Sequence, residues 1–316
     1  MKKSKKYKRY SNSQRLDFQS YAMERIKETR KAERHSTADL YRTTINWLNR
    51  YLQGKRLAFA DITAGMVDRF TDFLRATGLR TNSINTYLSN FRALYNYAWR
   101  DGYQFPKTSP FQHISLHWER SGAKALKESD LCEVLSLKPT EASLKKAIDY
   151  CTFSYLACGM PFADLARLTY KNIHNNEIIY HRKKTGSLIR VGITPYMKRL
   201  IKKYASSSSP YLFPILPPTR PVKHEEYKAL LRAYNHSLKT IGESLSLPLR
   251  LTSYIFRHTW ASEALRKHIS VTIISQALGH SSEKTTRFYL SALSQTELNK
   301  ANNIITQKIE TVLNNR

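Results

Sequence analysis

The sequence has little cysteine, few acidic residues and no long hydrophobic run. Its three cysteines, Cys132, Cys151 and Cys158, form no Cys-x-x-Cys pair. This argues against a disulfide framework or a cysteine-rich zinc site, and it is typical of a reducing compartment. The uncharged apolar stretch Tyr150–Ala163 is shorter than the ~20 residues that cross a bilayer, and the basic N-terminus lacks the apolar region of a signal peptide. The sequence therefore predicts a cytoplasmic protein without a membrane partner.

Two sequence patterns for cofactors are also missing. There is no GxxxxGK[ST] loop, which argues against a chain driven by ATP. The histidines His258, His268 and His280 have no spacing usual for zinc ligands. We therefore expect neither a cofactor nor a metal.

The scarcity of acidic residues leaves a strongly basic chain. Lys and Arg number 52 against 24 Asp and Glu, a formal net charge of +28. Such a chain binds polyanions, either a nucleic acid or an anionic membrane surface, because each phosphate contact releases condensed counterions. The 316 residues, 41 % of them hydrophobic, are enough for two domains with cores of their own.

The first part of the chain reads as a basic tail followed by a helical domain. Residues 1–13 form the tail, and residues 14–106 form the domain. Apolar residues recur at helical spacing over Ser36–Gln53, Thr63–Ala76 and Thr81–Arg100, which predicts three helices of a bundle.

The second part reads as a mixed domain. Residues 107–125 are interrupted by proline and glycine and have no period, so they are interpreted as a linker to a domain at 126–295. Two β-branched runs around a Thr-Gly turn predict a β-hairpin over Glu177–Ile193. An amphipathic helix at 296–316 could pack on its own domain or on a neighbouring subunit. The other predicted helices are Glu128–Leu137, Glu141–Ala157, Glu225–Ile241, Ser253–His268, Val271–Leu278 and Glu283–Ser291. The fold class is therefore mainly α with a small β-sheet.

The residues that carry chemistry lie between 251 and 290. Tyr254 and Arg257 are three apart and share a face at the start of a helix, where backbone N–H groups favour anions. Gly279 is a C-cap that places His280 in a tight turn, and Tyr289 lies on the next helix. Two helix ends and a turn can thus gather a guanidinium, an imidazole and a phenol around one phosphate.

This stretch resembles the C-terminal signature of the tyrosine recombinase (phage integrase) family. The pair Arg257-His258, the turn Leu278-Gly279-His280 and the later Tyr289 match that signature in type, order and spacing, and Lys184 before Thr185-Gly186 is similar to the family's hairpin lysine. The resemblance implies a helical SAM-like core-binding domain followed by an α+β catalytic domain.

The resemblance also implies roles for these residues. Tyr289 would attack a DNA phosphate and form a 3′-phosphotyrosine link, which stores the bond energy for religation. Arg257 and His280 would hold the non-bridging oxygens, where negative charge develops. Lys184, or Lys183 in its place, would protonate the leaving 5′-oxygen as general acid.

The sequence departs from the family pattern in two places. Tyr254 stands where the family usually has a histidine. The family's first catalytic arginine aligns with Pro161, or in a divergent subgroup with Cys158, and neither is cationic. Arg167 and Arg182 are the candidate substitutes.

The expected partner is double-stranded DNA. Candidate phosphate contacts are Arg80, Arg92, Arg100 and Lys183. The resemblance implies that the enzyme works as a homotetramer on two duplexes. Accessory DNA-bending proteins are possible further partners. The outcome, whether integration, excision or inversion, stays open.

Two other functions remain compatible with the sequence. One is a non-catalytic DNA-binding protein derived from a recombinase, because Ser270–Ser291 can be read as a helix-turn-helix and the first arginine is missing. The other is a type IB topoisomerase, which shares the nucleophile chemistry. The Leu-Gly-His turn and the small helical first domain favour the recombinase.

Overall fold

The computed structural model describes residues 17–103, 108–119 and 125–289, and for Phe288 and Tyr289 the backbone alone. The chain divides into two compact units, residues 1–119 and 120–316. The described elements are helices and one three-stranded sheet, so the predicted fold class is confirmed. The basic tail at 1–13 and the helix predicted at 296–316 lie outside the described residues.

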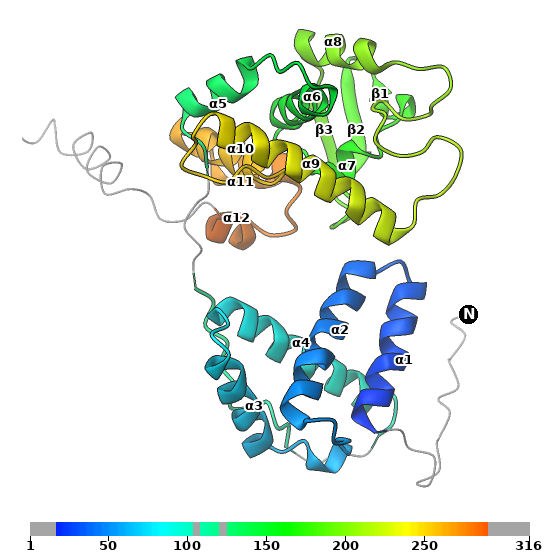
Figure 1. Ribbon diagram of the computed structural model, residues 1–316, viewed down its shortest axis with the longest axis vertical. Helices are drawn as coiled ribbons and strands as arrows, with labels where there is room; N and C mark the ends of the chain where they lie inside the picture. The colour runs from blue at the N-terminus through cyan, green and yellow to red at the C-terminus, as the bar shows by residue number, and fades with distance from the viewer. Residues whose placement is uncertain (1–16, 104–107, 120–124, 290–316) are drawn as a thin grey trace, which may run out of the picture. The chain divides into compact units, whose positions relative to one another are not determined.

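The first unit is a bundle of α-helices, drawn from blue to cyan in Figure 1. Its helices are α1 (Phe18–Lys31), α2 (His35–Leu52), α3 (Ala64–Ala76) and α4 (Thr81–Arg100). The last three match the predicted spans, whereas the sequence did not single out α1. Side-chain caps fix two of the starts, because Asp17 accepts a hydrogen bond from the Ser20 N–H and Thr63 accepts one from the Met66 N–H.

Part of the predicted linker belongs to this first unit. Phe111 is buried, and its ring meets that of Phe91 edge-on at 5.0 Å. The Asn85 amide donates to the carbonyl of His117, and the Asn82 amide donates to that of Glu119. The linker prediction for residues 107–125 was therefore wrong for the packed residues up to 119. The segment shows no period because it is irregular backbone held by side chains.

The second unit combines helices with an antiparallel sheet of order β1-β2-β3. The strands are β1 (Ile173–His174), β2 (Glu177–His181) and β3 (Leu188–Gly192), and Tyr180 pairs with Ile189. The predicted hairpin is confirmed, whereas β1, α7 and α8 were missed. The helices are α5 (Glu128–Ser136), α6 (Ala142–Leu156), α7 (Phe162–Leu165), α8 (Pro195–Tyr204), α9 (His224–Ser244), α10 (Ile255–Arg266), α11 (Val271–Leu278) and α12 (Glu283–Tyr289).

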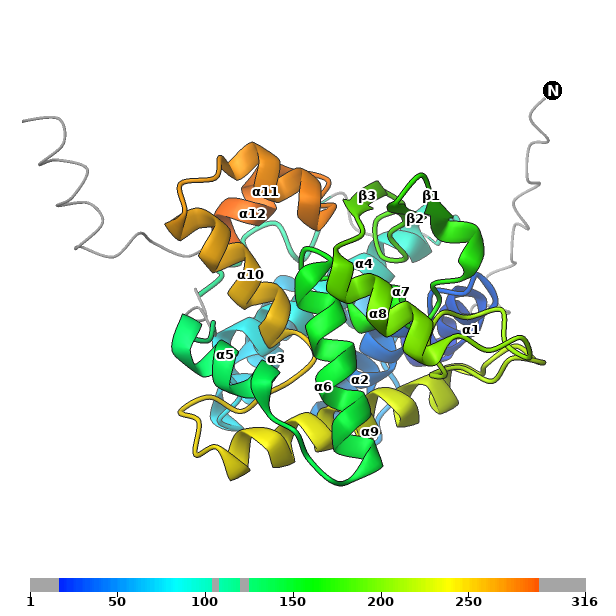
Figure 2. The same cartoon turned by 90° about the horizontal axis from the view of Figure 1, so that it is seen from above.

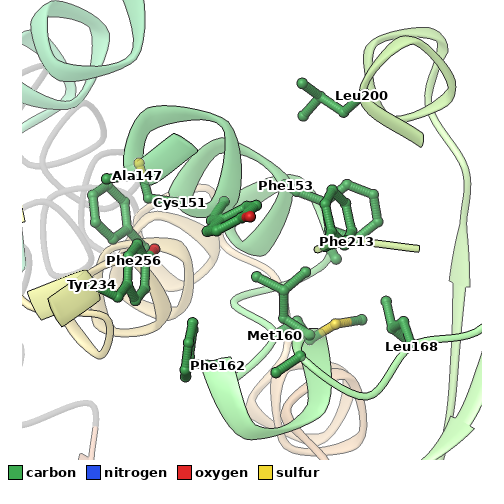
Figure 3. Close-up of a cluster of buried hydrophobic side chains, with 14 of the residues drawn as sticks. Ala147, Cys151, Phe153, Met160, Phe162, Leu168, Leu200, Phe213, Tyr234 and Phe256 are labelled. Carbon is green, nitrogen blue, oxygen red and sulfur yellow. The ribbon is translucent and has the colours of Figure 1, made fainter. Parts of the chain in front are cut away.

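The core of the second unit is built around α6, which lies in the middle of this unit in Figure 2. Residues 147–154 of α6 are all buried, so the helix is enclosed on every side. Phe153 packs edge-on against Phe213, and Phe162 stacks on Tyr234 with ring centroids 4.8 Å apart (Figure 3). Phe256 of α10 is fully buried in the same cluster. This burial anchors the start of α10, where Arg257 follows.

Among the helices of the described residues, none is both long enough and apolar enough to span a bilayer.

Candidate active site

Arg257 lies at the centre of the candidate site. Its side chain is only 2 % exposed. One terminal nitrogen donates to the Gly159 carbonyl oxygen at 3.0 Å, and the other donates to the Leu278 carbonyl oxygen. The second nitrogen also lies 3.4 Å from Nε2 of His280. The guanidinium therefore joins the segment after α6, the end of α11 and the predicted catalytic histidine.

Gly159 makes room for this arginine. Its φ is +69°, in the left-handed region, and a Cβ there would lie 2.7 Å from the Cα of Arg257. Because that neighbour is backbone, no side-chain rotation can relieve the contact. Only glycine allows the two segments to approach this closely.

The turn after α11 is held to the β2–β3 hairpin through the carbonyl group of Gly279. Gly279 has a φ of +61° and ends α11, as predicted. Its carbonyl oxygen accepts a hydrogen bond from Arg182 at 2.9 Å and another from the Thr185 hydroxyl at 3.0 Å. A Cβ at Gly279 would lie 2.6 Å from Cδ1 of Ile189 on β3. The β2–β3 hairpin is thus fastened to the turn that carries His280.

His280 is half-buried among positive charges. Its Nδ1 lies 2.8 Å from the Thr286 hydroxyl on α12. Burial, together with the charges of Arg257, Arg182 and Lys184, lowers the pKa of His280 to about 4. The imidazole is therefore neutral at pH 7, with one nitrogen as donor and the other as acceptor.

The hairpin turn carries the two predicted lysines, and the charge of Lys184 acts on this histidine. Lys183 and Lys184 are both exposed in the turn between β2 and β3. The backbone N–H of Lys183 donates to Oδ1 of Asp164 at 2.9 Å. Burial raises the pKa of the Asp164 carboxyl, although this bond and Arg182 oppose the shift. Asp164 and the Gly279 carbonyl together fix where the lysines emerge.

The two candidate substitutes for the first arginine lie in different surroundings. Arg182 is 4 % exposed, and its Nε is buried without a hydrogen-bond partner among the described residues. Arg167 instead donates to the Ala163 carbonyl oxygen and stacks over the Tyr227 ring at 4.9 Å. A cavity of about 430 Å³ lies beside them, lined by Arg167, Arg182, Asp164 and Lys183 among others.

The other sequence candidates are spread around the site or lie in the first unit. Tyr254 occupies the N-cap position of α10 and is exposed. Its ring meets the His258 ring edge-on, with centroids 5.0 Å apart. Arg80 and Arg100 are exposed at opposite ends of α4, and Arg92 is half-buried on the same helix. Nothing in their surroundings assigns them to DNA.

The structure places Tyr289 as the last residue of α12. Its side chain lies outside the described residues. Sequence reasoning missed Thr286 and Asp164, which touch His280 and the lysine hairpin. Thr286 stands between Thr285 and Arg287 in a polar stretch, and Asp164 is one acidic residue among apolar neighbours, so no spacing in the sequence sets either apart.

Comparisons with known proteins identify both units. Residues 17–114 match the model of the phage integrase SAM-like domain, and residues 126–296 match that of the phage integrase family. The chain is 21 % identical to the tyrosine recombinase XerD of Rickettsia bellii, over 90 % of this chain and 97 % of the relative. It is 29 % identical to the tyrosine recombinase XerA of Saccharolobus solfataricus, over 54 % of this chain and 53 % of the relative.

Solved structures share the fold. The integrase of transposon Tn1549, in complex with a circular-intermediate DNA, aligns with a TM-score of 0.67 at 15 % identity, over 92 % of this chain and all of that one. The XerH recombinase bound to its difH substrate in a post-cleavage complex aligns with a TM-score of 0.65 at 16 % identity, over 84 % of this chain and 79 % of that one. With the family model covering more than half of its length, the chain belongs to the phage integrase family.

Proposed function

We propose that this protein is a site-specific DNA recombinase that cleaves and rejoins DNA through a phosphotyrosine at Tyr289. The observation that carries the proposal is that one turn gathers the three groups. Arg257 binds the Leu278 carbonyl and lies beside His280, and the hairpin that carries Lys184 is hydrogen-bonded to the Gly279 carbonyl. Membership in the phage integrase family and similarity to XerD and XerA support the same reaction.

In this reaction the Tyr289 phenolic oxygen forms a bond to phosphorus while the bond from phosphorus to the 5′-oxygen breaks. The leaving 5′-oxygen takes a proton from Lys184, and the phenol releases its own proton to water. Arg257 and His280 stabilise the negative charge that builds on the non-bridging oxygens. The reverse reaction with a 5′-hydroxyl from another strand rejoins the DNA, so no ATP is consumed.

Arg182 supplies the charge that the family takes from its first arginine. The aligned positions cannot, because neither Pro161, the N-cap of α7, nor the thiol of Cys158 carries a positive charge. Arg182 is buried next to the His280 turn, and its charge contributes to lowering the pKa of His280, which supports this role. Arg167 is the weaker candidate, because its guanidinium is already stacked on Tyr227. Tyr254 stands at the family's histidine position and would serve as a hydrogen-bond donor to the phosphate.

The DNA is held by basic residues of both units. Arg80, Arg92 and Arg100 on α4 would contact phosphates from the first unit, and Lys183 from the second. The assembly would be a homotetramer on two duplexes, with accessory DNA-bending proteins where a site requires them. The non-catalytic alternative rests on the helix-turn-helix reading of Ser270–Ser291 and on the missing first arginine.

A covalent-trapping experiment tests the proposal. Duplexes that bind the purified full chain are first selected from a random library. The selected sequence is then made with a nick moved stepwise along one strand, so that cleavage next to the nick releases a short fragment and traps the enzyme. We expect an SDS-stable adduct, with the DNA linked to the peptide that contains Tyr289 by mass spectrometry.

The controls separate the competing functions. Tyr289→Phe must bind the same duplex and form no adduct. Binding without any adduct from the unaltered chain, at every nick position, would refute the proposal in favour of a DNA-binding protein. Efficient relaxation of arbitrary supercoiled plasmids would indicate a topoisomerase instead.

A further inference from the structure

Thr286 is a polar residue in an apolar position. It lies on α12, and its exposed fraction is 0 %. A buried hydroxyl requires a hydrogen-bond partner, because burial without one is costly. The partner is Nδ1 of His280, 2.8 Å from the hydroxyl oxygen. The neighbouring Thr285 is exposed and makes no such contact in the described residues.

The other ring nitrogen faces a group that can only donate. Nε2 of His280 lies 3.4 Å from a terminal nitrogen of Arg257, and a guanidinium has no acceptor. When Nε2 accepts a hydrogen bond from Arg257, the proton of the neutral ring sits on Nδ1. The Thr286 hydroxyl must then accept that proton's hydrogen bond.

The proposed reaction requires the opposite arrangement. To stabilise a non-bridging phosphate oxygen, His280 must donate from Nε2. A neutral ring that donates from Nε2 must accept at Nδ1. A threonine hydroxyl can serve in both cases, since it has one donor and two acceptor lone pairs, whereas a backbone carbonyl could only accept.

We infer that Thr286 is a positioning residue whose hydroxyl holds His280 in both tautomers. Without DNA the hydroxyl accepts a hydrogen bond from Nδ1. With DNA bound, Nε2 donates to the phosphate and the hydroxyl donates to Nδ1. This inference rests on the proposed function. The same bond also ties His280 to the helix that ends at Tyr289. Positions 286 and 289 are three apart and share a face of α12, so the bond fixes how that face is set against the His280 turn.

Three variants test the role in catalysis. Thr286→Val removes the hydroxyl at nearly constant volume, Thr286→Ser keeps the hydroxyl, and Thr285→Val is the matched control one residue away. The measurement is the single-turnover rate of adduct formation on the nicked duplex. We expect Thr286→Val to lower this rate about 5- to 10-fold, the value of one hydrogen bond. Thr286→Ser and Thr285→Val should stay within about twofold of the unaltered chain.

A second measurement reads the tautomer directly. The ring ¹⁵N resonances of His280, assigned by their loss in His280→Gln, report which nitrogen carries the proton. We expect the proton on Nδ1 without DNA and on Nε2 in the complex with duplex DNA. A proton on Nε2 without DNA would overturn the inference.

The kinetic outcomes are equally decisive. An unchanged rate in Thr286→Val, or a serine variant as slow as the valine variant, would also overturn it. Failure of the proposed function looks different, because the unaltered chain would then form no adduct at all, while the ¹⁵N measurement without DNA would still report the hydrogen bond.

Discussion

Replacing Gly159 by alanine should displace Arg257 and destabilise the second unit. Two costs add. The left-handed backbone at φ +69° costs an L-residue about 1–2 kcal/mol. A Cβ placed 2.7 Å from the Arg257 Cα forces the two segments apart, which by analogy with overpacked cores costs about 1–3 kcal/mol.

The sum is about 2–5 kcal/mol, a large share of the 5–15 kcal/mol that stabilises a typical domain. Gly186 provides the matched control within the same unit. Its φ is +72°, but a Cβ there would meet nothing within 4 Å. Gly186→Ala should therefore lose only the backbone contribution of about 1–2 kcal/mol.

Scanning calorimetry measures both variants against the unaltered chain. For a unit of this size, each kcal/mol lowers Tm by roughly 2–4 °C, so Gly159→Ala should fall clearly below Gly186→Ala. The transition that shifts should be that of the second unit, because the two units can unfold separately. Equal decreases in Tm for the two variants would refute this prediction. They would show that the contact with the Arg257 backbone adds nothing to the cost of an alanine at position 159.

Three further predictions concern the charged residues of the site. The unfolded chain protonates His280 near its ordinary pKa of 6.5 and the folded chain only at a pKa of about 4, so acidification between these values favours unfolding. In urea titrations across this pH range, His280→Gln should lose less unfolding free energy than the unaltered chain. Equal losses of unfolding free energy in the two chains would contradict the lowered pKa. Arg182→Ala should slow adduct formation about 100-fold, the effect of losing one charge-stabilising donor, whereas Arg167→Ala should change it less than about threefold; the reverse order in single-turnover assays would make Arg167 the substitute. Lys184→Ala should slow cleavage of ordinary DNA at least about 100-fold. Its cleavage rate should recover on a duplex with sulfur in place of the bridging 5′-oxygen, because a thiolate leaves without a proton. A variant equally slow on both substrates would exclude the general-acid role.

The sequence determined the elements that depend on neighbours a few residues apart. The helix predicted over Thr81–Arg100 is α4 with the same ends, because an apolar stripe at helical spacing and a stop at Gly102 are local signals. The hairpin at Glu177–Ile193 and the Gly279 cap follow from equally local chemistry. The signal for α8 was present too, since Thr194 caps it and Pro195 occupies its first turn. By contrast, α7 has only four residues, too few to show a period.

The family, and with it the candidate chemistry, could also be read from the sequence. The signature residues keep their type and spacing because they lie on consecutive turns and helices of one stretch. The departures at Pro161, Cys158 and Tyr254 were equally visible. The choice between Arg167 and Arg182 as the proposed substitute for the first arginine was not, because it depends on burial and contacts that folding creates.

Only the tertiary structure decided what those residues experience. Arg257 bonds to the carbonyl of a residue 98 positions away, and Arg182 to one 97 positions away. No local period encodes such contacts, so neither the burial of the two guanidinium groups nor the lowered pKa of His280 could be predicted. The pairing of Thr286 with His280 and the packing of Phe111 into the first unit have the same origin. Sequence pattern selects residues and local backbone, whereas desolvation and charge at the site arise from segments brought together by folding.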